Sequence, residues 1–310
     1  MNLGNKNLPQ IEGPAYLTDG GMETTLIFLE GEELPLFSAY VLLEDVRGRE
    51  VLKNYYKSYL GIAKNLGVGF ILESATWRCS KDWGEKLGHD AAKLAALNRE
   101  AIALLEALKG EYLGTAPIVI SGNIGPRGDG YRPEATMTAD EAEAYHAAQI
   151  ATFAGTAADL VTAMTMTHTG EAIGVVRAAV RAGMPVVIAF TTETDGRLPS
   201  GETLREAIEK TDAATDAAAA YYMVNCAHPE HFAGALTEGD WRLRIRGVRA
   251  NASRKSHAEL DEATELDVGD IGRLVRGYEE LVEVLPNLTV FGGCCGTDHR
   301  HVHAIAEACI

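Results

Sequence analysis

The sequence predicts a single-domain α/β protein of the (β/α)8 class, the TIM barrel, over residues 1–310. Eight short runs rich in Val, Ile, Phe and Tyr alternate with longer segments of helical composition along the whole chain. Several of the short runs lack polar alternation, as expected for strands that are buried on both faces of a parallel sheet. Eight such units in 310 residues match a closed barrel in number and in length. A doubly wound open sheet is the alternative.

The expected strands lie, in chain order, at 15–18, 69–74, 117–122, 159–163, 185–190, 221–225, 245–251 and 288–293. The clearest helical patterns lie between them, at 45–67, 89–110, 138–158, 170–183 and 270–286. Thr138 ahead of acidic Glu141 is typical of a helix start. Gly67, Gly110 and Gly183 are typical of the position just past a helix end. No linker or low-complexity segment interrupts this alternation, which favours one domain.

The composition is that of a soluble globular enzyme, with 46% hydrophobic and 23% charged residues. The formal net charge is −16 and the 28 Lys and Arg residues are scattered, which argues against a nucleic-acid or anionic-membrane surface. No run approaches the roughly 20 apolar residues of a membrane span, and the polar start lacks the apolar core of a signal peptide. We therefore expect a cytoplasmic protein that acts on small molecules. A homo-oligomer is compatible with this composition.

The five cysteines are too few and too uneven in number for a disulfide framework, so grouped cysteines indicate metal ligands or catalytic thiols. Cys294 and Cys295 are adjacent in GGCCGT, and Cys226 ends an apolar run in YYMVNCAHPE. In a barrel, strands six and eight flank strand seven, so these three thiols are expected to meet and to hold one soft metal ion. The alternative for the adjacent pair is a buried apolar pair or a vicinal disulfide. Cys79 and Cys309 are expected to be ordinary thiols.

Other polar residues also follow predicted strands, where the βα loops of a barrel converge on the active site. They are Asp19 with Gly20 and Gly21, Glu73 and Thr76, Asn123 with Gly125 and Pro126, Thr165, residues 191–195, Asn225 and Asn251. His299, His301 and His303 follow the last strand, but they begin a helix. Since alternate positions do not share a helix face, at most one of these histidines is expected near the metal.

Four motifs resemble those of the zinc- and thiol-dependent homocysteine S-methyltransferases. They are DGGMETTL (19–26), GNIGPRGDGY (122–131), VNC (224–226) and GGCCGT (292–297). The two cysteine motifs, in this order and separation, carry most of the specificity. The resemblance implies a barrel that holds Zn²⁺ through Cys226, Cys294 and Cys295, with the fourth position left for the substrate thiol. It also implies an enzyme that moves a methyl group from a sulfonium or betaine-type donor to homocysteine, giving methionine.

The resemblance further implies an amino-acid site formed by Asp19, Gly20 and Gly21, with Asn123 and Thr165 in neighbouring loops. This chain departs from the family at one position, because Met164 stands where the family has a glutamate that grips the amino group of homocysteine. We hypothesise that Glu73 supplies the missing carboxylate. Trp77 and Trp83 are candidates for stacking on a cationic methyl donor.

Two further interpretations remain open at this stage. The barrel could act on a different thiol or selenol acceptor, or work with a separate corrinoid protein as its partner. Alternatively, it could be a lyase without a metal, in which the cysteines are structural. The last interpretation requires that a Cys226→Ala protein keeps its activity and that the purified protein carries no zinc.

Overall fold

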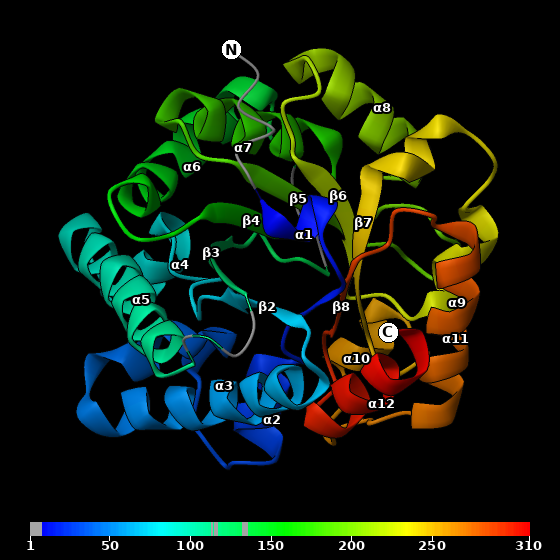
Figure 1. Ribbon diagram of the computed structural model, residues 1–310. Coiled ribbons are helices and arrows are strands. Elements are labelled where there is room, and N and C mark those ends of the chain that lie inside the picture. The colour runs from blue at the N-terminus through cyan, green and yellow to red at the C-terminus, as the bar shows by residue number, and fades with distance from the viewer. Residues whose placement is uncertain (1–7, 113, 115–116, 132–135) are drawn as a thin grey trace.

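The computed structural model of the protein describes residues 8–112, 114, 117–131 and 136–310. Parallel strands β1 to β8 form a closed barrel in chain order, and β8 pairs with β1 (Figure 1). Their bounds are Tyr16–Leu17, Gly69–Glu73, Ile118–Ile124, Leu160–Met166, Val186–Phe190, Tyr221–Asn225, Ile245–Ala250 and Val290–Gly293. The predicted (β/α)8 class and all eight predicted strands are confirmed.

Strand β4 is longer than the sequence pattern indicated, because it continues past residue 163 to Met166. Its pairing with β5 shifts between Ala163 and Met166, and Thr165 in this stretch has a φ of 62°. Only a local departure from regular β geometry allows a strand to continue through such a residue. Thr165 therefore lies inside the irregular end of the strand and not in the loop after it.

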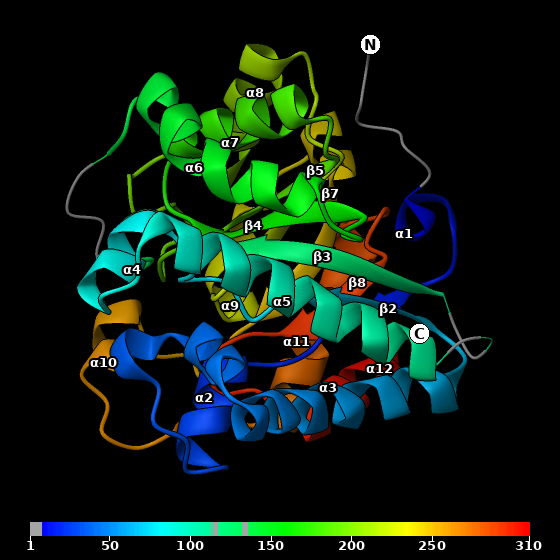
Figure 2. The ribbon, with the colours of Figure 1, turned by 90° about the vertical axis from the view of Figure 1, so that its left-hand side faces the viewer.

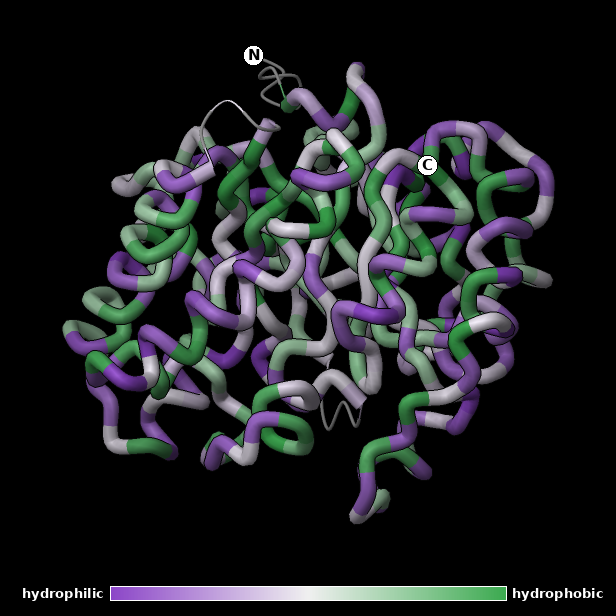
Figure 3. The backbone as a smooth tube through the Cα atoms, turned by 60° about the horizontal axis from the view of Figure 1, so that its bottom comes forward, coloured by the Kyte–Doolittle hydropathy of each residue, from purple (hydrophilic) through white to green (hydrophobic). Residues whose placement is uncertain are grey.

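Helices surround the barrel on its outer side (Figure 1). Those of ten or more residues are α3 (Val46–Leu66), α5 (Ala91–Glu111), α6 (Ala139–Ala154), α7 (Thr169–Ala182), α8 (Leu204–Thr215), α11 (Ile271–Val284) and α12 (His299–Cys309). Shorter ones are α1 (Pro9–Glu12), α2 (Met22–Phe28), α4 (Lys81–Lys86), α9 (Pro229–Phe232) and α10 (His257–Asp261). Hydrophilic and hydrophobic stretches alternate along the outer helices in Figure 3, as expected for helices with one face on the barrel.

Most of the predicted helix boundaries agree with the structure. Thr138 forms a capping box with Glu141 at the start of α6. Gly67 and Gly183 follow α3 and α7 with φ of 69° and 70°, the left-handed conformation that glycine adopts without steric cost. Gly110 differs, since α5 runs through it and ends at Glu111.

The barrel is packed at the end where its strands begin and open at the other. Its interior holds a cluster of buried apolar side chains, among them Tyr16, Ile71, Val119, Leu160, Val187, Tyr221, Met223 and Val290. Helix α1 covers this end, because Gln10 donates a hydrogen bond to the Tyr221 hydroxyl and Arg246 donates to the Ile11 carbonyl. Figure 2 shows α1 at one end and α2, α4 and α10 toward the other. Within the described ranges, no helix has the length and apolar character needed to cross a membrane.

Candidate functional site

A cavity of about 360 Å³ opens at the carboxyl ends of the strands. Of the other residues that follow predicted strands, Asn225 lines this cavity, whereas Thr76, Gly125, Pro126, residues 191–195 and Asn251 do not. All nine residues predicted for the metal and substrate sites line it: Asp19, Gly20, Gly21, Glu73, Asn123, Thr165, Cys226, Cys294 and Cys295. They come from six of the eight strand ends, which is possible only because parallel strands in a barrel all finish at the same face. The outer wall is formed by α2, by residues 129–131 and by residues 260–267.

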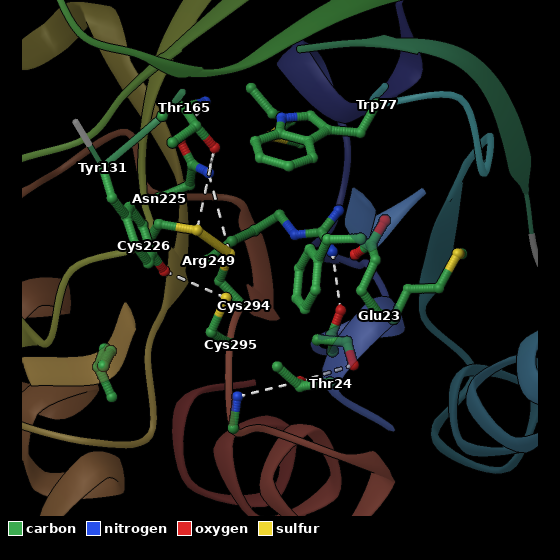
Figure 4. A pocket seen from close by; sticks show the side chains of 18 of the residues that line it. Glu23, Thr24, Trp77, Tyr131, Thr165, Asn225, Cys226, Arg249, Cys294 and Cys295 are labelled. Atoms are coloured by element: carbon green, nitrogen blue, oxygen red, sulfur yellow. Dashed lines mark hydrogen bonds between the residues drawn. A yellow bond between two sulfur atoms is a disulfide. The ribbon is translucent and has the colours of Figure 1, made fainter. Parts of the chain in front are cut away.

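The three cysteines converge at one point of this cavity (Figure 4). Cys226 follows β6, and Cys294 and Cys295 follow β8. Their sulfur atoms all lie within 4.8 Å of one another, and they form the one group of potential metal ligands found among the described residues. His299, His301 and His303 are not part of this group. His301, for example, is bound through Nδ1 to Asp298 and through Nε2 to the Val268 carbonyl.

Cys226 and Cys294 are joined by a disulfide, with their Cα atoms 5.3 Å apart, while Cys295 keeps a free thiol. The sequence did not predict this bond, which links cysteines 68 positions apart and is therefore not vicinal. Thiols that are positioned to share one ion are also close enough to bond to each other. The same convergence therefore accounts for both a metal-ligand set and a disulfide.

The backbone at Cys226 is held in an unusual conformation. Its φ is 55°, in the left-handed region that non-glycine residues rarely adopt. The Cys226 N–H donates to the Arg249 carbonyl at 3.1 Å. Its own carbonyl accepts hydrogen bonds from His257 Nε2 at 2.8 Å and Asn251 Nδ2 at 3.0 Å. Such a residue persists only when its surroundings fix it, so these contacts set the direction of the Cys226 side chain.

Asn225 ties the end of β4 to the cysteines. Its Oδ1 accepts from the Thr165 N–H at 2.9 Å, and its Nδ2 donates to Thr165 Oγ1 at 2.9 Å. The same Nδ2 lies 3.9 Å from Cys294 Sγ. The side-chain amide therefore fixes the irregular Thr165 and also places a donor beside one sulfur.

The loop after β1 interlocks with the loop that carries the cysteines. The Gly21 N–H donates to the Thr297 carbonyl at 3.0 Å, and the Gly296 N–H donates to Thr24 Oγ1 at 3.2 Å. A Cβ atom on Gly21 would lie 2.5 Å from the Cys294 carbonyl oxygen. Gly21 is therefore required for the close approach of two backbones, in addition to lining the cavity.

Buried charges form the floor of the cavity. Asp19 is 2% exposed and pairs with Arg249 at 2.7 Å, and it accepts a hydrogen bond from the Tyr55 hydroxyl at 2.9 Å. Burial raises the pKa of Asp19, although Arg249 opposes this effect. Glu73 is also 2% exposed, and burial raises its pKa to about 7 against the opposing effects of Arg249 and of the Ser121 and Thr162 hydroxyls.

We expect the difference in the free energy of unfolding between the Glu73→Gln protein and the unchanged protein to shift in favour of the variant as the pH rises. The folded-state pKa of Glu73 is about 7, above the ordinary value of 4.5, so protonation favours folding. The protonated Glu73 carboxyl group therefore stabilises the unchanged protein at low pH. This stabilisation, which amounts to at most about 3 kcal/mol, is lost as the pH rises from about 4.5 through 7. Urea unfolding at pH 5 and pH 8 measures the difference. An equal difference at both pH values would contradict the prediction.

Among the cavity-lining residues that the sequence did not predict, Arg249, Glu23 and Tyr131 carry groups of chemical interest. Arg249 lies on β7 in IRGVRAN and offered no signal other than a charge within a strand. Glu23 and Tyr131 lie within the recognised motifs DGGMETTL and GNIGPRGDGY but were not singled out. Figure 4 shows Tyr131 beside the cysteines, with Glu23 and Trp77 across the cavity.

Tyr131 is hydrogen-bonded to one of the cysteines. Its hydroxyl donates to Cys295 Sγ at 3.2 Å, and its ring stacks on His257 with centroids 4.1 Å apart. Burial raises the pKa of the Cys295 thiol to about 11, and the hydrogen bond from Tyr131 opposes that rise. The loop before Tyr131 is anchored by the Glu171 carboxylate, which accepts from the Arg127 N–H at 2.7 Å.

We expect Tyr131→Phe to slow the alkylation of Cys295 by iodoacetamide several-fold at fixed pH, because the thiolate loses a hydrogen-bond donor. The rate is followed by mass spectrometry of the peptide that contains Cys295, in metal-free protein. Tyr145→Phe is the matched control, since its hydroxyl bonds to Ser80 and Asp82, not to a sulfur atom. Equal rates in all three proteins would show that the Tyr131 hydrogen bond does not influence the thiol.

The outer part of the cavity is aromatic and acidic. Trp77, Phe28 and Phe37 line it, together with Glu23 on the first turn of α2. Burial raises the pKa of Glu23 to about 7, and no ion pair to this carboxylate is found within the described parts of the chain.

Trp83 does not line the cavity and is therefore no candidate for stacking on a donor there. It packs instead under the Arg78 guanidinium, 3.8 Å from the ring centroid.

The fold and this cavity define a barrel enzyme with a three-thiol site at the carboxyl ends of its strands. A family model described as homocysteine S-methyltransferase matches residues 16–309, so the chain belongs to the homocysteine S-methyltransferase family and is a methyltransferase.

Solved structures with a similar fold include the homocysteine methyltransferase MmuM from Escherichia coli. Its oxidized form has a TM-score of 0.75 and 20% sequence identity, with 96% of each chain covered. The metallated form has a TM-score of 0.73 at the same identity and coverage, and the apo form has 0.68. At this level of identity the similarity concerns the fold. A comparison with curated protein sequences found no match.

Proposed function

We propose that this protein transfers a methyl group from a sulfonium or betaine-type donor to the thiol of homocysteine, giving methionine, with Zn²⁺ held by Cys226, Cys294 and Cys295. The observation that carries the proposal is the convergence of three cysteine sulfurs within 4.8 Å at the floor of a cavity in a barrel of this family. Three thiolates with one open position are a donor set that suits a catalytic zinc ion.

The cysteines fit such an ion when all three are reduced, so the Cys226–Cys294 disulfide must be opened before metal binds. When bound, zinc lowers the pKa of a coordinated thiol and so supplies a thiolate nucleophile at neutral pH. In the transfer, the new C–S bond forms as the bond from the methyl carbon to the onium centre breaks. The donor then leaves as a neutral thioether or tertiary amine with the electron pair.

The residues of the chain contribute orientation and the exclusion of water. The hydrogen bonds to the Cys226 carbonyl and the contact of Asn225 with Cys294 hold two ligands in fixed directions. Trp77 and the Glu23 carboxylate offer an aromatic face and a negative charge to a cationic donor in the outer cavity. Positioning two reactants in this way accounts for much of the rate that an enzyme gains in a displacement reaction.

We further propose that Asp19, Gly20, Gly21, Glu73, Asn123 and Thr165 form the acceptor site. Met164, 4% exposed, lines this part of the cavity and cannot bind an ammonium group. Glu73 is the carboxylate that replaces the missing acid. Its Oε2 is buried and has no hydrogen-bond partner among the described residues, and it therefore has capacity for a ligand donor.

Replacing Glu73 with Gln is expected to raise the KM for homocysteine about 10- to 100-fold, the effect of losing a charged hydrogen bond worth roughly 1.5–3 kcal/mol. Zinc content should stay unchanged, because Glu73 is not a metal ligand. Glu265→Gln is the matched control, since this exposed carboxylate lies at the rim of the same cavity. An unchanged KM in the Glu73 variant would rule out this role.

The function is tested by supplying the reduced, zinc-loaded protein with homocysteine and, in turn, S-methylmethionine, S-adenosylmethionine, glycine betaine and dimethylsulfoniopropionate. Methionine formation with one of these donors is expected. If no donor gives methionine, the Met164 position favours the second candidate function. This is methyl transfer to a different thiol or selenol acceptor, or transfer with a separate corrinoid protein, and it is tested with a panel of thiols and selenols under the same conditions.

A further inference from the structure

Arg249 is the buried cation of the cavity floor. It projects from β7, is 7% exposed and lines the cavity. Its Nη2 contacts Asp19 and donates to the Gly20 carbonyl at 3.1 Å, and its Nε donates to the Gly293 carbonyl at 3.0 Å. These contacts fix the plane of the guanidinium between the loops that follow β1 and β8.

The remaining nitrogen, Nη1, is buried and has no hydrogen-bond partner among the described residues. An unsatisfied buried donor costs roughly 1–3 kcal/mol, and more when the group is charged. Such groups are rare and call for an explanation. Asp19 already neutralises the charge of Arg249 through the other terminal nitrogen, Nη2, so Nη1 is not needed for that ion pair.

Charges around Arg249 indicate what it could bind. Arg249, Glu73 and Cys295 all line the same cavity. A ligand with its sulfur at the cysteines would therefore have its other end near a guanidinium donor and a carboxylate acceptor. An α-amino acid carries a carboxylate and an ammonium group on one carbon, and it matches this pair of opposite charges.

We propose that Arg249 binds the carboxylate of the acceptor through Nη1 and is a determinant of acceptor specificity. The proposal rests on the proposed function, in which the acceptor is an amino-acid thiol and Glu73 binds its ammonium group. Guanidinium binds carboxylates in a directional way that a lysine ammonium cannot reproduce. Met164 stands where one of the acids expected around the ammonium group would lie. The enzyme is therefore expected to depend more on the carboxylate of the acceptor, bound by Arg249, than on its ammonium group.

The test is calorimetric binding of the methylated product and two of its analogues to the reduced, zinc-supplemented protein. The ligands are L-methionine, 4-(methylthio)butanoate, which lacks the ammonium group, and 3-(methylthio)propan-1-amine, which lacks the carboxylate. The unchanged protein should bind the amine at least tenfold more weakly than methionine. Equal affinity for these two ligands would overturn the proposal without any variant.

Variants assign the effect to Arg249. Arg249→Lys keeps a positive charge next to Asp19 and should weaken methionine and the butanoate by tenfold or more, while leaving the amine unchanged. Arg246→Lys is the matched control, since Arg246 lies on the same strand at the opposite end of the barrel. A folded Arg249→Lys protein that binds all three ligands as before would also overturn the proposal.

Binding and turnover together distinguish a failure of the role of Arg249 from a failure of the proposed function. Methionine formation with no preference for the carboxylate would leave the proposed function standing and remove the role of Arg249. Failure of the unchanged protein both to bind methionine and to methylate homocysteine would overturn the proposed function, and this inference with it.

Discussion

Replacing Cys226 with alanine is expected to abolish tight zinc binding and to lower methyl transfer by about a thousandfold or more. Without the ion, the acceptor is a mostly protonated thiol that is not held in the direction of attack. A thousandfold loss corresponds to an increase of about 4 kcal/mol in the barrier. Cys226 is one of three sulfurs in the cluster and is oriented by hydrogen bonds to its own carbonyl. Removing it leaves two sulfurs, a set too small for a structural or catalytic zinc site.

The measurement combines metal analysis of the reduced protein with the methionine-forming assay. Cys309→Ala serves as the matched control, because this free cysteine lies on α12 outside the cluster and its loss should change neither quantity. Full activity in a Cys226→Ala protein without metal would mean that the cysteines are structural, and it would contradict the proposed function.

Gly21→Ala is expected to destabilise the fold by roughly 1–3 kcal/mol, the usual cost of forcing extra volume into a packed site. The added Cβ would lie 2.5 Å from the carbonyl oxygen of Cys294 and equally close to Thr24 Oγ1. The Cys294 contact is with backbone, which cannot move without shifting the cysteine loop. Zinc affinity should therefore fall together with the free energy of unfolding.

Gly61→Ala is the same chemical change, but it is expected to stabilise the fold. Gly61 lies within α3, and a Cβ built there meets no atom within 4 Å. Because alanine is a better helix former than glycine, by about 1 kcal/mol, this variant should be more stable than the unchanged protein. Urea unfolding of both variants, together with a zinc titration, tests the pair. A Gly21→Ala protein as stable as the unchanged one would show that the two loops can separate without cost.

The fold was predictable from the sequence because its signals are local. Runs such as PVVIAF and YYMVN are apolar at successive positions, which is typical of strands covered on both faces. The capping box at Thr138 and the glycines after α3 and α7 are also local features. The end of β4 was missed because a left-handed residue inside a strand, Thr165, is fixed by a distant partner, Asn225.

The candidate site was predictable only where topology could place a residue. Strand order brings Cys226 near Cys294 and Cys295, and the structure shows the three together. The disulfide, the hydrogen bond from Tyr131 and the pairing of Arg249 with Asp19 depend on side-chain directions, which no sequence pattern encodes. Arg249 in particular looked like an ordinary strand residue, since a charge in a barrel interior is justified only by partners from other strands.

The interlock of the first and last loops also determines when the site can form. The contact of Gly21 with Thr297 spans 276 positions of the chain, and β8 must pair with β1 before the barrel closes. Contacts of such long range form late and slowly. On the ribosome, a nascent chain could contain Cys226 for some time before its partner thiols have been synthesised. We therefore expect metal capture only after the chain has been synthesised through Cys295 and β8 has paired with β1.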